Sequence, residues 1–242
     1  MSNEPVPEHI VRSYDEELRR LRDMTARMGG LAERQVADST QALVRRDTAL
    51  ATEVVQRDVQ IDQLEREIEA FCVRLLALRQ PVASDLRIII AAMKVSNDLE
   101  RIGDYAANGA KRSLVLSSLP AIGSLNGFER MAHLVQENLK AAMDAFVNSD
   151  AEAARRVWEA DEPVDAIYNG IFRELLTFMM EDPRNITSAT HMLFIAKNLE
   201  RIGDHTTNIA ERIHYAVRGD NLPEDRPKAD ESAYAVVRPA GS

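Results

Sequence analysis

The chain of 242 residues lacks features on which several protein classes depend. It has a single cysteine, Cys72, so no disulfide can form within it, which suits a reducing compartment. Because free cysteine packs as a small hydrophobe, we interpret Cys72 as a core residue. The longest apolar run, 88–93, is far shorter than the ~20 residues that span a bilayer. With no basic segment and apolar run at its start, we expect a soluble, cytoplasmic protein without direct membrane insertion.

Excess positive charge and strand patterns are also missing. The formal net charge is −9, and no basic stripe is visible along the sequence, so we expect no nucleic-acid partner. Aromatic residues make up only 5%, and no segment of useful length alternates apolar and polar residues, which excludes a β fold. What remains is helical periodicity almost everywhere. The predicted helices are 9–46, 48–79, 84–116, 126–148, 151–181 and 187–217.

The predicted breaks coincide with residues that start or stop helices. Asp47 and the adjacent pair Ser149-Asp150 stand where N-caps belong, and Ser149 with Glu152 has the spacing of a capping box. Pro81 and Pro183 fall in the second loop of each half of the chain, where a helix cannot continue. Within the first helix, the adjacent glycines at 29 and 30 predict a bend, with a true break as the alternative.

An internal repeat divides the chain into two similar halves. Residues 91–112 align with 191–212 at an offset of 100, and both contain Leu-Glu-Arg-Ile-Gly-Asp. Upstream, 57–62 align with 160–165 at an offset of 103. We therefore predict an all-α fold of two tandem, pseudo-symmetric three-helix bundles, each with its own core. The predicted segments are a flexible N-terminus (1–8), the first bundle (9–118), the second bundle (124–217) and a flexible proline-containing tail (218–242).

Each half carries two acidic pairs at i,i+4 spacing, which places both members of a pair on one helix face. In the third predicted helix the acids flank the apolar stripe through Val95, Leu99 and Ile102, so they should line a surface groove. The candidate metal ligands are Asp58, Asp62, Glu100 and Asp104 in the first half, and Asp161, Asp165, Glu200 and Asp204 in the second.

Repulsion between these acids suggests a bound cation. Like charges at i,i+4 destabilise a helix by a few tenths of a kcal/mol, and coordination removes that cost. Carboxylates suit Mg²⁺, Mn²⁺ or iron, do not exclude zinc, and leave room for more than one ion per site. The alternative is an ordinary solvated face on which Arg101 and Arg201 neutralise the acids.

The glycines and asparagines of the repeat each allow two interpretations. Mid-helix glycine costs about 1 kcal/mol relative to alanine, so Gly103 and Gly203 indicate either close helix approach or space for a ligand. Asn108 and Asn208 lie one turn beyond the motif and are possible accessory ligands, with capping or surface hydrogen bonding as the alternative.

Other chemical motifs are absent or incomplete. Glu211 and His214 form the Glu-x-x-His pair of di-iron bundles, but the first half has no second copy, so Glu211 stays an accessory candidate only. His205 projects away from Glu200, and Trp158 and the methionines are interpreted as packing residues. No P-loop, dinucleotide fingerprint or recognisable nucleophile is present, and we predict no catalytic residue.

The two copies of Leu-Glu-Arg-Ile-Gly-Asp followed by Asn, each preceded by Asp-x-x-x-Asp, resemble the PhoU family over about residues 9–217. The resemblance implies two three-helix bundles, frequent dimerisation and multinuclear metal clusters held by the eight acids named above. It also implies negative regulation of the phosphate-starvation response, with the sensor histidine kinase and the phosphate ABC transporter ATPase as partners. Contact with the inner membrane would then run through those partners. The rival hypotheses are a metal-free helical adaptor and a carboxylate-bridged di-metal enzyme.

Overall fold

The structure, a computed structural model, describes residues 8–160 and 162–223, and every regular element in these ranges is a helix. The predicted all-α class is confirmed. The elements are α1 (Glu8–Arg45), α2 (Thr48–Arg79), α3 (Ala83–Ser117), α4 (Asn126–Asn148), α5 (Ala151–Glu159), α6 (Glu162–Glu181), the 3₁₀ turn η1 (Pro183–Asn185) and α7 (Ile186–Arg218). The predicted flexible ends lie outside the described residues, except that Glu8 and Arg218 are helical and 219–223 follow α7.

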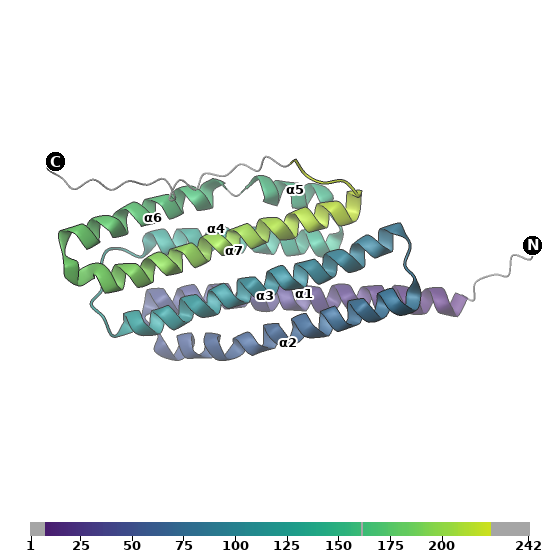
Figure 1. Cartoon of the computed structure of the whole chain (residues 1–242), viewed down its shortest axis with the longest axis horizontal. Helices are drawn as coiled ribbons and strands as arrows, with labels where there is room; N and C mark the ends of the chain where they lie inside the picture. Colours follow the sequence, from purple (N-terminus) through teal and green to yellow (C-terminus); the bar gives the residue numbers. More distant parts are fainter. Residues whose placement is uncertain (1–7, 161, 224–242) are drawn as a thin grey trace, which may run out of the picture.

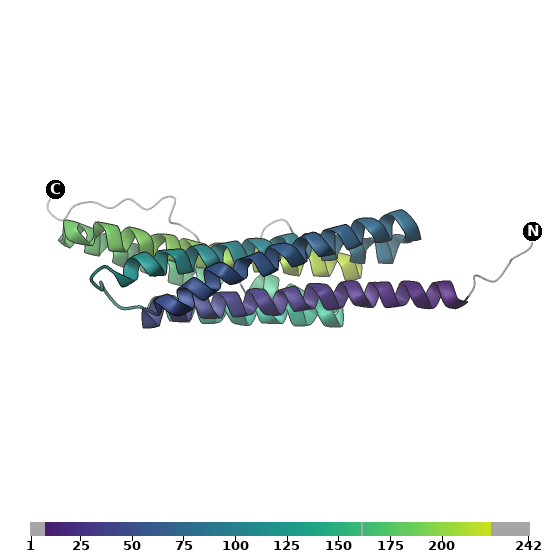
Figure 2. The same ribbon diagram turned by 90° about the horizontal axis from the view of Figure 1, so that it is seen from below.

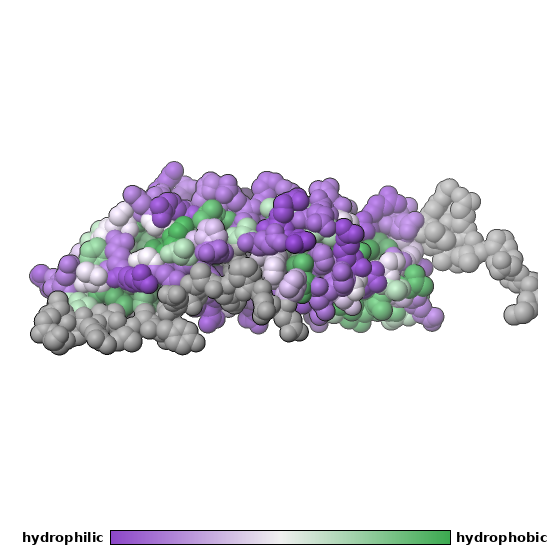
Figure 3. Space-filling view, turned by 90° about the horizontal axis from the view of Figure 1, so that it is seen from above, coloured by the Kyte–Doolittle hydropathy of each residue, from purple (hydrophilic) through white to green (hydrophobic). Residues whose placement is uncertain are grey.

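The helices form two three-helix bundles that lie side by side (Figure 1). One contains α1, α2 and α3, and the other contains α4, α7 and the pair α5–α6. Turned by 90°, the molecule shows two layers, with α1 and α4 lying below α3 and α7 in the picture (Figure 2). Figure 3 looks onto the α5–α6 side, where the visible surface is mainly hydrophilic with smaller apolar areas.

The two halves do not have separate cores. Buried apolar side chains from all seven α-helices form one continuous cluster, from Leu18 in α1 to Ile213 in α7. This differs from the predicted pair of self-contained cores, because α1 packs on α4 and α3 packs on α7. Cys72 and Trp158 belong to this cluster, which confirms their interpretation as packing residues.

The predicted caps at Asp47 and at Asp150 are confirmed, and the predicted capping box of Ser149 is wrong. Asp47 does cap α2, accepting a hydrogen bond from the Leu50 N–H at 2.9 Å. Ser149, however, closes α4 in the left-handed conformation (φ 52°), so it is unable to cap the next helix. Asp150 caps α5 instead, accepting from the amides of Glu152 and Ala153 at 3.0 and 2.9 Å.

The predicted helix 151–181 is in fact two helices. α5 ends at Glu159 and α6 begins at Glu162. Pro163, the second residue of α6, has no N–H to donate, and its ring would clash with the carbonyl of Glu159 in a continuous helix. Proline is tolerated in the first turn of a helix, so the chain restarts there.

The adjacent glycines do not interrupt α1, which is continuous from Glu8 to Arg45, so the alternative of a true break is wrong. Gly29 lies against α4: a Cβ there would come within 2.6 Å of Met143 Cε and 2.9 Å of its Cγ. A Cβ on Gly30 would meet nothing within 4 Å. Only Gly29 is therefore required for the close approach of α1 and α4.

This contrast predicts opposite effects of two alanine substitutions. Gly30→Ala should stabilise the protein by about 0.5–1 kcal/mol, because alanine is the better helix former and meets no neighbour. Gly29→Ala should destabilise it by about 1 kcal/mol, because overpacking against Met143 outweighs that gain. Urea unfolding of the two variants measures both changes, and equal effects would contradict the assignment of Gly29 to the α1–α4 contact.

Candidate functional site

The first candidate site lies where α2 and α3 approach each other. A Cβ on Gly103 would lie 2.9 Å from Ile61 Cδ1 and 3.3 Å from Asp58 Oδ1. These are contacts tighter than side chains normally make, so Gly103 is needed for close helix approach, the first of its two predicted readings. The same missing side chain leaves the Asp58 carboxylate next to the α3 backbone.

The environment of Asp58 opposes its ionisation. Burial, followed by the charges of Asp104 and Asp62, raises the pKa of Asp58 to about 6. Lys111 and a hydrogen bond from Gln35 act in the opposite direction. The Gln35 amide donates from Nε2 to Asp58 Oδ1 at 2.9 Å. The ionised form of Asp58 is therefore unfavourable in this environment, and a nearby cation would stabilise it.

Glu100 is in a similar position on α3. Burial, followed by the charge of Asp104, raises its pKa, while Arg101 lowers it. Its Oε2 atom is buried and accepts no hydrogen bond from the described residues, although Arg101 Nε lies 3.5 Å away. A buried carboxylate oxygen without a donor costs free energy unless something binds it.

Gln35 belongs to this site although the sequence did not single it out. It is fully buried on α1, and its Oε1 atom has no hydrogen-bond partner among the described residues. Through its hydrogen bond to Asp58, it adds a polar side chain of α1 to the contact between α2 and α3. Only the packing of α1 on α2 brings Gln35 there, 23 positions from Asp58 in sequence, so no motif could have revealed it.

The structure thus gathers the four predicted acids of the first half, because Asp58, Asp62, Glu100 and Asp104 influence one another electrostatically. Asn108 is exposed one turn away. The donor set, carboxylates with one amide oxygen, fits a hard divalent cation. As the side chains stand, however, the described residues include no group of three or more His, Cys, Asp or Glu in metal-holding geometry.

The second candidate site, between α6 and α7, is less open. Asp165 and Glu200 are buried, and Lys197 Nζ lies 2.9 Å from Glu200 Oε1. The same ammonium group lies 5.1 Å from the centre of the Tyr168 ring. Asp204 contributes to the field on Arg201. Asp161, the remaining predicted ligand, lies outside the described residues. In the second half, Lys197 therefore supplies positive charge beside Glu200. A bound cation would have the same effect on the acids of the first half.

The accessory candidates of the second half have structural partners. Trp158 Nε1 donates to Glu211 Oε1 at 3.0 Å, which ties Glu211 to α5. His214 is buried, with Nε2 3.4 Å from Asp220 Oδ1. His205 Nδ1 lies 2.8 Å from Asp98 Oδ1 of the other half, so the ring points away from Glu200, as predicted. Asn208 is half-buried on α7.

Nucleophilic chemistry finds no support at the cysteine. Cys72 is fully buried, and burial raises the pKa of its thiol to about 12, so it stays protonated at neutral pH.

None of the described helices combines the length and apolarity needed to cross a bilayer.

Comparison with known proteins points to one family. The model of the PhoU domain matches residues 25–113 and 128–213, which are the two halves of the repeat. A phosphate-specific transport system accessory protein PhoU homolog of Caulobacter vibrioides is 54% identical over 92% of this chain and 97% of its own length. The corresponding protein of Rhizobium meliloti is 48% identical over 92% of this chain and 94% of its own length.

Solved structures agree with the sequence comparison. The crystal structure of PhoU from Pseudomonas aeruginosa matches with a TM-score of 0.82 and 44% identity, covering 86% of this chain and all of that one. The structure of the phosphate transport system regulatory protein PhoU from Streptococcus pneumoniae has a TM-score of 0.81 and 31% identity, covering 87% of this chain and 99% of that one. The duplicated helical motif and the relatives that match nearly the whole chain agree: the chain belongs to the PhoU family.

Proposed function

We propose that this chain is a metal-binding regulator of phosphate signalling and uptake, which acts by contacting other proteins and not by catalysis. The observation that carries the proposal is the acidic cluster of the first half, where the pKa values of Asp58 and Glu100 are raised by burial and by neighbouring acids, and where Glu100 Oε2 is buried without a donor among the described residues. A bound cation would neutralise the repulsion among these acids and stiffen the contact between the helices.

The names of the relatives support the regulatory role in this proposal. They are called accessory proteins of the phosphate-specific transport system or a regulatory protein of phosphate transport. We extend this role to the present chain. It would link the transporter ATPase to the sensor histidine kinase and restrain the phosphate-starvation response, as a cytoplasmic homodimer that reaches the inner membrane through those partners.

Two alternatives make different predictions. A metal-free adaptor would gain nothing from divalent cations, and Lys197 beside Glu200 shows how a protein side chain alone offsets one of these acids. A di-metal enzyme would need histidine ligands or an enclosed site. In the described part of the chain, His205 and His214 contact Asp98 and Asp220, and neither joins the acidic motif.

Deletion of the gene tests the regulatory role. We expect expression of phosphate-starvation genes to become constitutive in phosphate-rich medium, and the wild-type copy to restore repression. Repression that is unaltered in the deletion strain would refute the proposed function, whatever the protein binds.

Metal binding predicts a selective effect of removing two first-half acids. In Glu100→Gln with Asp104→Asn, affinity for Mn²⁺ should fall by about tenfold or more, because two carboxylates of the cluster lose their charge. The matched control is Glu129→Gln with Glu137→Gln, which removes two exposed acids of α4 and should leave affinity within about twofold. Calorimetric titration of metal-free protein measures both, and absence of Mn²⁺ binding by the wild type would favour the adaptor.

The raised pKa of Asp58 predicts a pH-dependent stability change. Above its unfolded-state value the unfolded chain ionises Asp58 more readily than the folded one, so stability falls as pH rises toward about 6 and then levels off. Asp58→Asn removes this penalty while keeping the oxygen that accepts from Gln35. In EDTA, the variant should therefore exceed the wild type in stability by about 1 kcal/mol at about pH 8, with the difference shrinking toward about pH 4.

The exposed Asp23→Asn serves as the control and should change stability equally at the two pH values. Urea unfolding at each pH provides the comparison. Added Mn²⁺ should reverse the ranking, because it stabilises only the protein that retains the Asp58 carboxylate. A ranking that is the same at both pH values and with metal would contradict the assigned role of Asp58.

A further inference from the structure

The linker between the two halves, residues 118–125, forms one wall of a cavity of about 200 Å³. The linker leads from the end of α3 to the start of α4 at the left of Figure 1, near the start of α7. Apolar side chains from both halves line the cavity: Leu43 of α1, Leu116 of α3, Ile122 of the linker and Met192 of α7. None of the described candidate metal ligands lines it. We call this space, at the joint of the two halves, the linker cavity.

Two contacts hold the linker in place around the cavity. Arg46 Nη2 donates to the carbonyl oxygen of Ser117 at 3.1 Å and also to that of Leu119, which fixes the end of α3 and the start of the linker. Further along, Gly123 (φ 60°) lies against α6, where a Cβ would come within 2.5 Å of Phe178 Cε2. A wall held at two places does not collapse to fill the space, so the cavity is formed before a ligand arrives.

One polar side chain of the linker cavity is left without a hydrogen bond from the described residues. Ser188, in the first turn of α7, is only 4% exposed and lines the cavity, and its hydroxyl bonds to none of the described residues. The other two serines of the lining, Ser113 and Ser117, donate to the carbonyl oxygens of Gly109 and Leu114. A buried hydroxyl without a partner costs free energy, which a hydrogen bond from a ligand would recover.

The size and polarity of the cavity define the kind of molecule that fits. An apolar cavity of about 150 Å³ holds one benzene ring, so a volume of about 200 Å³ suits a single ring with a small substituent. Among the described residues of the lining, Arg46 is the only charged one, and it is already bonded to backbone carbonyls. Both α1 and α3 end beside the cavity, and the partial negative charge of helix C-termini disfavours an anion. A neutral molecule is therefore favoured.

We infer that the linker cavity is a binding site for a small neutral molecule with one aromatic ring and one hydroxyl or N–H group. The ring fills the space between Leu43, Leu116 and Met192, and the polar group forms a hydrogen bond with Ser188. Because the lining comes from both halves and from the linker, an occupant stiffens the joint between them. The inference goes beyond the proposed function and does not depend on it, since neither metal nor phosphate takes part.

Benzyl alcohol is a suitable probe, because it carries one ring and one hydroxyl. We expect the wild-type chain to bind it with a dissociation constant of about 1 mM or lower, measured by ligand-observed NMR, and to unfold at a higher temperature in its presence. Benzoate, which has the same ring and a negative charge at neutral pH, should bind at least about tenfold more weakly. Absence of saturable benzyl alcohol binding, or tighter binding of benzoate, would overturn the inference.

Filling the cavity should block the probe. Ser117→Leu adds a larger apolar side chain to the lining and should weaken benzyl alcohol binding by about tenfold or more. Its matched control is Ser118→Leu, at an exposed neighbour outside the lining. The hydroxyls of both serines donate to backbone carbonyls of α3, so the two variants lose similar hydrogen bonds. The control should stay within about twofold of the wild type, and equal weakening by the two would contradict the site.

Replacing the serine hydroxyl tests the predicted hydrogen bond. Ser188→Ala should weaken binding of benzyl alcohol by about fivefold, because the ligand hydroxyl loses its partner. Toluene has the same ring without the hydroxyl, so its affinity should change by less than about twofold. This variant removes a hydroxyl that bonds to none of the described residues, so the fold should be retained. Equal loss of both ligands would exclude Ser188 as the polar contact and overturn the inference.

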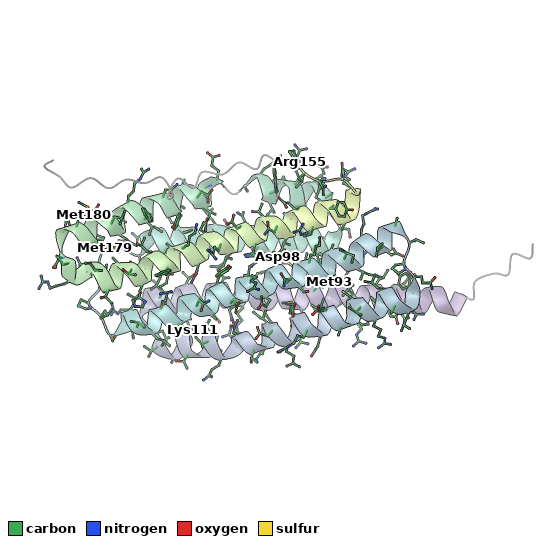
Figure 4. All side chains as sticks on the ribbon, in the orientation of Figure 1. Met93, Asp98, Lys111, Arg155, Met179 and Met180 are labelled. Atoms are coloured by element: carbon green, nitrogen blue, oxygen red, sulfur yellow. The ribbon has the colours of Figure 1, made fainter. Side chains whose placement is uncertain are left out.

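A further control excludes adsorption of the ring to the surface. Met180 of α6 lies at the same end of the molecule (Figure 4), is 50% exposed and does not line the cavity. Met180→Ser should leave the affinity for benzyl alcohol and for toluene within about twofold of the wild type. Weakening of both by this variant, with none by Ser117→Leu, would show binding to exposed apolar side chains and contradict a site in the linker cavity.

Discussion

The antiparallel packing of α3 on α7 is the contact on which the rest of this molecule depends. Each of these helices carries one copy of the repeated motif and also packs on a helix that carries further acids of the repeat, α3 on α2 and α7 on α6. Their mutual contact, with α1 on α4 behind it, merges two three-helix units into one continuous core. Asp98 with His205 and Arg201 with Tyr105 join the two halves at this contact.

The two acidic sites are related by the repeat but differ in the charged groups beside them. In the first half, burial and neighbouring acids raise the pKa values of Asp58 and Glu100, and Arg101 lies 3.5 Å from Glu100 Oε2. In the second, Lys197 Nζ lies 2.9 Å from Glu200 Oε1. In the repeat, Met93 corresponds to Leu193 and Lys94 to Phe194.

Local sequence signals predict where the helices lie but do not predict all of the helix ends correctly. Periodicity and the proline positions identified the helices, and Asp47 was recognised as a cap. Sequence alone leaves the cap shared between the adjacent Ser149 and Asp150, and the left-handed backbone at Ser149 decides in favour of Asp150. The break near residue 160 was missed although Pro163 signals it, because the apolar pattern continues through the break. The adjacent glycines in α1 reflect contact with α4, which no local rule contains.

The sequence by itself determined the fold class, the duplication, the family and the spacing of the acids, since all of these depend on neighbours along the chain. Only the tertiary structure decided which groups meet across helices: Gln35 with Asp58, Lys197 with the Tyr168 ring, and Arg112 with Phe194. The physical reason is that side chains a hundred positions apart become neighbours only when the helices that carry them pack together.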